Sequence, residues 1–173
     1  MSLPVHGDPG SLSQAGGALR QLATRLRTSG RRAHDAFDEE WRGRPDRVVG
    51  AARREVDAVD AAAAAASHEL DRVGSAVQAH ASDLAESVAQ ARSIVARADA
   101  AGLRVAGGVV HQEWGVTGVA DGGATEAREQ SRARLQAELD QVVVLLGRRR
   151  KQLAATLAAS GEVLAGHAAR LRP

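Results

Sequence analysis

The sequence predicts an all-α fold, an elongated helical hairpin that a third long helix extends to an antiparallel, coiled-coil-like three-helix bundle. Three stretches, at about residues 9–40, 46–101 and 124–170, carry apolar side chains at the spacing of an amphipathic helix. The middle stretch repeats them every seven residues and contains no proline. We therefore divide the chain into a hairpin over 1–101, a Gly/Val-rich connection over 102–123, and a third helix within 124–173.

The first helix begins with a strong start signal. Asp8 is a good N-cap, and Pro9 suits the first helical position, where its missing N–H has no intrahelical partner to lose. The apolar stripe that follows is Leu12, Ala15, Leu19, Leu22 and Leu26. It weakens at Gly30, where a kink is possible, and resumes through Ala33 and Phe37, which predicts a helix to about Glu40.

The second helix has the most regular pattern in the chain. Gly43 and Pro45 interrupt the first helix, and Asp46 offers a new N-cap. Residues at positions a and d of successive heptads then form a seam. The a positions are Val49, Val56, Ala63, Leu70, Val77, Leu84, Ala91 and Ala98, and the d positions are Ala52, Val59, Ala66, Val73, His80, Ser87 and Ile94. A helix of this length would extend roughly 80 Å, which favours a rod over a globule.

The third helix is expected to fold back along the second. Its stripe is Leu135, Leu139, Val142, Leu146, Leu153, Leu157, Leu164 and Leu171. Arg149 and His167 occupy positions where apolar residues are expected, so this seam is poorer. In the preceding connection, the alternation around Val105, Val109 and Val116 would permit a short β-hairpin, with an irregular loop as the alternative.

Composition excludes several classes of protein. The chain has no cysteine, so disulfides and thiolate metal sites are impossible. It has no apolar stretch long enough for a membrane span. Its first residues lack the basic and apolar regions of a signal peptide, so we expect any export not to use the general secretory route. The pI is about 10.2, but the net charge is only +2, because arginine supplies nearly all the cations and little else titrates at high pH. We therefore expect no nucleic-acid partner.

Catalytic, cofactor and metal sites are not expected. The glycines of 102–123 match no nucleotide-binding pattern, and Ser67 and His68 are helix neighbours that point about 100° apart. The six histidines include no pair at i and i+4. His80 lies in the seam, where it either sets the register or makes a pH-sensitive contact. The basic cluster 148–151 either pairs with carboxylates of another helix or binds an anion.

Trp41 and Gly43 are the candidate functional residues. The chain has three aromatic residues, Phe37, Trp41 and Trp114, and Trp41 lies with Gly43 in a Trp-x-Gly motif between two helices. Trp41 is either a hydrophobic lid on the end of the bundle or a residue that recognises a partner. We favour recognition, because a tryptophan near a turn has few neighbours on which to pack.

This arrangement resembles the WxG superfamily of ESAT-like helical hairpins handled by type VII, or ESX-type, secretion systems. The resemblance covers about residues 7–100 and is closest to divergent actinobacterial members that open with Gly-Asp-Pro, here Gly7-Asp8-Pro9. It implies a four-helix bundle of two hairpins, homodimeric or heterodimeric, exported as a folded pair. It also implies that Trp41 and Gly43 help form a recognition surface with the partner's C-terminal tail.

The family's export signal is a Tyr followed after three residues by Asp or Glu, and this chain has no Tyr. Either the partner supplies the signal, or the chain is the N-terminal portion of a longer effector-like arrangement. We therefore expect a non-enzymatic interaction protein, a type VII substrate, effector leader or chaperone-like partner. We expect it to bind itself or another helical hairpin, with a secretion ATPase as a further partner. It would be exported by a non-Sec route or reside in the cytoplasm before export. The alternative is an intracellular coiled-coil scaffold or adaptor.

Overall fold

The computed structural model describes residues 5–43, 47–112 and 122–170. It contains helices α1 (Pro9–Glu40), α2 (Arg47–Ala100) and α3 (Gly122–Arg170), and strands β1 (Leu103–Ala106) and β2 (Val109–Gln112). About 88% of the described residues are helical, which confirms the predicted all-α fold. No helix among the described residues is long and apolar enough to cross a membrane.

The chain forms two compact units. The first contains residues 1–9 and 80–151, and the second contains residues 10–79 and 152–173. The boundaries of these units differ from those that we drew at 101 and 123, because α2 and α3 are each divided between the two units. We describe each unit by itself.

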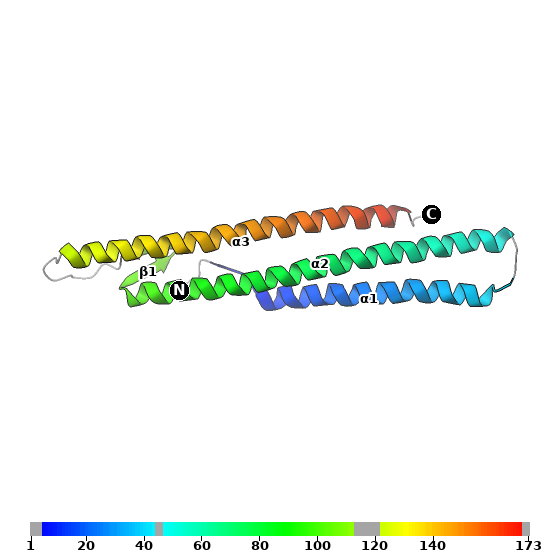
Figure 1. Cartoon of the computed structure of the whole chain (residues 1–173), viewed down its shortest axis with the longest axis horizontal. Helices are drawn as coiled ribbons and strands as arrows, with labels where there is room; N and C mark the ends of the chain where they lie inside the picture. Colours follow the sequence, from blue (N-terminus) through cyan, green and yellow to red (C-terminus); the bar gives the residue numbers. More distant parts are fainter. Residues whose placement is uncertain (1–4, 44–46, 113–121, 171–173) are drawn as a thin grey trace. The chain divides into compact units, whose positions relative to one another are not determined.

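In the second unit, α1 runs antiparallel to the first half of α2 (Figure 1). Ion pairs along the two helices show the direction, because the partner's number falls on α2 as the residue number rises on α1. The pairs are Arg20–Asp71 at 2.9 Å, Arg27–Asp60 at 3.7 Å, His34–Asp57 at 3.1 Å and Asp38–Arg53 at 2.9 Å. Three of the four pairs match a basic residue of α1 to an aspartate of α2, and the fourth matches Asp38 of α1 to Arg53 of α2.

Small residues bring these two helices close together. A Cβ atom on Gly16 would lie 2.7 Å from the carbonyl oxygen of Gly74, and one on Gly30 would lie 2.8 Å from the Cβ of Ala63. Gly16, Ala23 and Gly30 are the buried residues of α1 and recur every seven residues. A larger side chain at these positions would force the helix backbones apart.

The apolar stripe that we predicted for α1 is therefore not the centre of its buried face. Leu22 is 50% exposed, and Ala15 and Ala33 are also exposed. Leu12, Leu19 and Leu26 are half-buried beside the buried glycines and alanine. Gly30 lies within a continuous helix, and its role is close approach to α2.

The heptad seam of α2 is largely confirmed. From Val73 onward, every a and d position is buried, including the polar His80 and Ser87. Nearer the start of the helix the seam is more open, and Val59 is 44% exposed. Burial along α2 is thus continuous in its second half and partial in its first.

In the first unit, a β-hairpin forms part of the Gly/Val-rich connection. Arg104 pairs with His111 and Ala106 with Val109 in the antiparallel register. Gly107 and Gly108 form the two-residue turn with φ of +59° and +83°, values that suit the right-handed twist of the strands and favour glycine. The hairpin that the sequence permitted is present, whereas Val116 lies outside the described residues.

Gln136 of α3 holds this hairpin. Its side-chain oxygen accepts a hydrogen bond from the backbone N–H of Val110 at 2.8 Å, and its amide nitrogen donates to the carbonyl oxygen of Gly108 at 3.2 Å. Leu103, Val105 and Val110 are buried. The hairpin therefore belongs to the core of the first unit.

Within the first unit α3 runs antiparallel to α2. Leu135, Leu139, Val142 and Leu146 are buried, as the predicted stripe requires. In the second unit the stripe is less regular. Leu153 and Leu164 are half-buried and Leu157 is 41% exposed, while the buried residue is Ser160. Leu171 lies outside the described residues.

Candidate functional site

Trp41 follows the last residue of α1 and packs on its own helix. Its backbone N–H donates to the carbonyl oxygen of Phe37 at 3.1 Å, which continues the helical pattern by one residue. The two rings stack with their centroids 6.4 Å apart and an interplanar angle of 29°. Trp41 is nevertheless 36% exposed, so a substantial part of its surface faces solvent.

Gly43 allows the chain to leave α1. Its φ of +78° lies in the left-handed region, which side chains other than glycine adopt only with strain. A Cβ atom built on Gly43 would meet nothing within 4 Å. The glycine is thus required by backbone conformation and not by crowding.

Charged side chains surround this aromatic pair. The guanidinium of Arg53 lies 6.0 Å from the centroid of the Phe37 ring, within the range of a cation–π contact. Arg53 also pairs with Asp38 at 2.9 Å. Phe37 therefore contacts both Trp41, just after the end of α1, and Arg53 on α2. We refer to Phe37, Trp41 and Gly43 as the Trp41 site.

The Trp41 site offers a partly exposed indole ring and an adjacent phenyl ring, next to the ion pair of Arg53 and Asp38. None of its side chains is a nucleophile, and the described residues contain no group of His, Asp or Glu side chains that could hold a metal ion. Trp114 lies outside the described residues, so the structure does not relate it to this site.

The histidines singled out in the sequence lie apart from the Trp41 site. His68 is exposed, and its nearest carboxylate is that of the adjacent Glu69, 3.8 Å away. His80 is buried in the α2 seam, and its Nδ1 has no hydrogen-bond partner. The structure thus places His80 within the seam, as the heptads predict, with one ring nitrogen that makes no hydrogen bond.

The basic cluster 148–151 contributes contacts within the first unit. Arg149 pairs with Asp83 at 3.0 Å and lies 3.8 Å from Glu86, both on α2. Arg150 donates to the carbonyl oxygen of His6 at 2.9 Å. Arg149 thus occupies an apolar position of the α3 stripe but pairs with acidic residues of α2. This pairing is the first of the two interpretations given above for the basic cluster.

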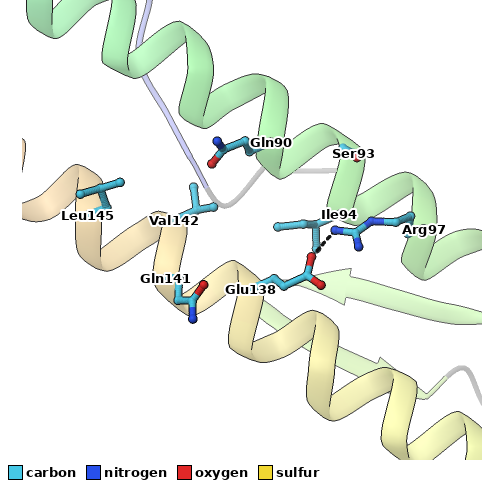
Figure 2. A pocket seen from close by; sticks show the side chains of 8 residues that line it. All are labelled: Gln90, Ser93, Ile94, Arg97, Glu138, Gln141, Val142 and Leu145. Atoms are coloured by element: carbon cyan, nitrogen blue, oxygen red, sulfur yellow. Dashed lines mark hydrogen bonds and ion pairs between the residues drawn. The ribbon is translucent and has the colours of Figure 1, made fainter.

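A groove of about 330 Å³ lies between α2 and α3 in the first unit (Figure 2). Its lining residues are Gln90, Ser93, Ile94, Arg97, Glu138, Gln141, Val142 and Leu145. Arg97 and Glu138 point toward each other across the helices and form an ion pair. The hydrogen bond from Arg97 is the main cause that lowers the pKa of Glu138 from its ordinary value of 4.5.

A polar contact between α2 and α3 in the second unit was missed by the sequence analysis. Ser160 is 1% exposed and accepts a hydrogen bond from Arg72 at 2.6 Å. Hydrogen bonds from Arg72 and Ser160 lower the pKa of Glu69 from 4.5. A signal was available, because Ser160 continues the seven-residue spacing of Leu139, Leu146 and Leu153.

Comparison of the chain with protein-family models, with curated proteins and with solved structures gives no significant match.

Proposed function

We propose that this chain is a non-enzymatic interaction protein of type VII secretion, acting as a substrate, an effector leader or a chaperone-like partner. The observation that carries the proposal is the place of Trp41. It lies at the end of the first helix of an antiparallel hairpin, stacked on Phe37 yet 36% exposed, two residues before a glycine with φ of +78°. This is where the WxG resemblance expects a partner-recognition motif.

The proposed partner is a second copy of this chain or another helical hairpin, and a secretion ATPase is a further possible partner. A partly exposed tryptophan beside a second aromatic ring is the kind of residue that dominates binding energy in protein interfaces. Phe37, on which Trp41 stacks, is contacted by Arg53 of α2, which also pairs with Asp38 of α1. The surface is thus supported by α1 and α2 together, which favours recognition without a large rearrangement.

A scaffold or adaptor that functions inside the cell is the second candidate. The observation in its favour is α2, which is helical without interruption from Arg47 to Ala100 and carries heptads along its length. Such a helix can link partners without any role in export. The two candidates differ in what Trp41 does.

Export and co-purification from a host that carries a type VII system test the proposal. The tagged chain should appear in the culture medium and co-purify with a helical-hairpin protein, and both results should be lost with Trp41→Ala. Export should also fail when the secretion ATPase of the host is inactivated. Leu22→Ala, which truncates an exposed apolar residue elsewhere on α1, is the matched control and should retain both results.

The stability of the Trp41→Ala variant distinguishes a residue that recognises a partner from a hydrophobic lid on the end of the bundle. Because the ring is partly exposed, we expect the variant to lose less than the roughly 3–5 kcal/mol typical of a buried tryptophan, and to remain folded. A chain that stays in the cell and binds partners equally well with and without Trp41 would support the scaffold instead.

A further inference from the structure

His34 lies on α1 within a cluster of carboxylates. Its Nε2 is 3.1 Å from Oδ1 of Asp57 on α2. Its Nδ1 is 3.8 Å from Oδ2 of Asp38 and 3.9 Å from Oδ1 of Asp35, both on α1. The side chain is 34% exposed, so the imidazole can exchange protons with solvent.

The charged groups around His34 come from both helices. On α1 they are Asp35 and Asp38, and on α2 they are Asp57 and Arg53, the last of which pairs with Asp38 at 2.9 Å. Three carboxylates and one guanidinium leave a net negative surrounding. Arg53 partly neutralises Asp38 but is not within ion-pair distance of Asp57.

Protonation changes what His34 can bind. A neutral imidazole has one N–H donor, so it can donate toward Asp57 or toward Asp38, but not toward both. An imidazolium has two N–H donors and a positive charge, so both carboxylates then attract it. Histidine is the side-chain type whose charge ordinarily changes near neutral pH, whereas aspartates change charge in more acidic solution.

We propose that His34 is a pH-sensitive clamp that fastens the end of α1 to α2 when it takes up a proton. Trp41 lies seven residues farther along the same chain, and Phe37, on which it stacks, lies one helical turn beyond His34. The clamp therefore orders the part of α1 that carries the Trp41 site as the pH falls. The clamp itself requires no partner, whereas its effect on recognition rests on the proposed function.

A double-mutant cycle at two pH values tests the clamp. The melting temperatures of the wild type, His34→Gln, Asp57→Asn and the double variant are measured at pH 7.5 and pH 5.5. For a partly exposed ion pair, we expect His34→Gln to lower the Tm by about 1–3 °C more at pH 5.5 than at pH 7.5. Asp57→Asn should remove this additional loss, because the imidazolium then lacks its partner on α2.

His68→Gln is the matched control. His68 is another exposed histidine beside a carboxylate, but that carboxylate belongs to its neighbour Glu69 on the same helix. Its substitution should leave the change in Tm between the two pH values unaltered. A coupling between His34 and Asp57 that is absent, or that does not grow as the pH falls, would overturn the proposal.

Hydrogen exchange gives a local readout that does not depend on global unfolding. After correction for the intrinsic pH dependence of exchange, amides of residues 37–43 should be better protected at pH 5.5 than at pH 7.5 in the wild type, and equally protected in His34→Gln. Equal protection in the wild type would also overturn the clamp. If the clamp is observed but Trp41→Ala leaves export and partner binding intact, the proposed function fails and this inference remains.

Discussion

At the scale of single residues, glycines decide how closely α1 approaches α2. A Cβ atom on Gly16 would lie 2.7 Å from the backbone oxygen of Gly74, a contact that cannot be relieved by rotating a side chain. We expect Gly16→Ala to destabilise the protein by about 1–3 kcal/mol, the cost of overpacking. Part of this loss is offset by the higher helix propensity of alanine, roughly 1 kcal/mol.

Gly147→Ala is the matched control. Gly147 also lies inside a helix, but a Cβ atom there would meet nothing within 4 Å. This variant should raise the free energy of unfolding by about 0.5–1 kcal/mol through helix propensity alone. Chemical denaturation of the two variants measures the contrast, and a Gly16→Ala variant as stable as Gly147→Ala would show that the helices are not in close contact at Gly16.

The same glycines explain why the sequence misplaced the buried face of α1. A search for large apolar residues finds Leu12, Leu19, Leu22 and Leu26, because burial is usually driven by large side chains. Here the contact face is built from Gly16, Ala23 and Gly30, which have almost no side chain to signal it. Their seven-residue spacing was visible, but glycine in a helix ordinarily indicates weakness and not contact.

At the scale of helices, charged residues match α2 to its neighbours. Arg20, Arg27 and Arg149 pair with aspartates of α2. The sequence offered such pairing as one of two interpretations of the basic cluster 148–151, and it predicted the a and d seam of α2 because heptads repeat without a break. It did not predict the contacts of Ser160 and Gln136: Ser160 continues the seven-residue spacing of the α3 stripe but is polar, and Gln136 lies outside that stripe.

The pairing of α2 with α3 should weaken in acid. Arg97 lowers the pKa of Glu138 from 4.5, so the folded state favours the ionised carboxylate. A group whose pKa is lower in the folded state adds stability above its unfolded pKa, and this contribution disappears as the pH falls through the folded value. Glu138→Gln should therefore lower the Tm near pH 7, and the difference from wild type should shrink as the pH falls below about 4.5.

Glu126→Gln provides the control for this titration. Glu126 lies in the exposed first turns of α3, so its substitution should change the Tm little at any pH. Thermal melts of both variants between pH 3 and pH 7 compare the two carboxylates directly. A Glu138→Gln deficit that stayed constant over this range would assign the loss to packing and not to the charge.

At the scale of the whole molecule, helix content is the first property to measure. The described residues are about 88% helical, far above the roughly one-third of an ordinary globular protein. The far-ultraviolet circular dichroism spectrum should therefore be dominated by the two helical minima. A spectrum with a third or less helix would contradict the fold, including the antiparallel contacts from which the Trp41 site and the His34 clamp are argued.

Association is the second whole-molecule property, and exposed apolar side chains are the reason to expect it. Val143, Val144 and Leu145 are consecutive exposed residues on α3, and Val48 on α2 is 74% exposed. Consecutive residues on a helix point about 100° apart, but three exposed apolar side chains on one turn of α3, with Leu145 lining the groove, leave apolar surface of the kind that interfaces cover. We therefore predict a homodimer, or a heterodimer with another helical hairpin. The competing outcome is a monomer, which the ion pairs of α2 with α1 and α3 would support.

Light scattering from about 1 to 100 μM distinguishes these outcomes. A homodimer should approach twice the monomer mass of 18.0 kDa as the concentration rises. If the α3 surface forms the interface, the double variant Val144→Gln, Leu145→Gln should weaken association by tenfold or more, since burying each such side chain contributes about 1.5–3 kcal/mol. Leu22→Gln, an equally exposed position on α1, should not. A mass of 18.0 kDa throughout would exclude the homodimer and leave the heterodimer to co-purification from the host.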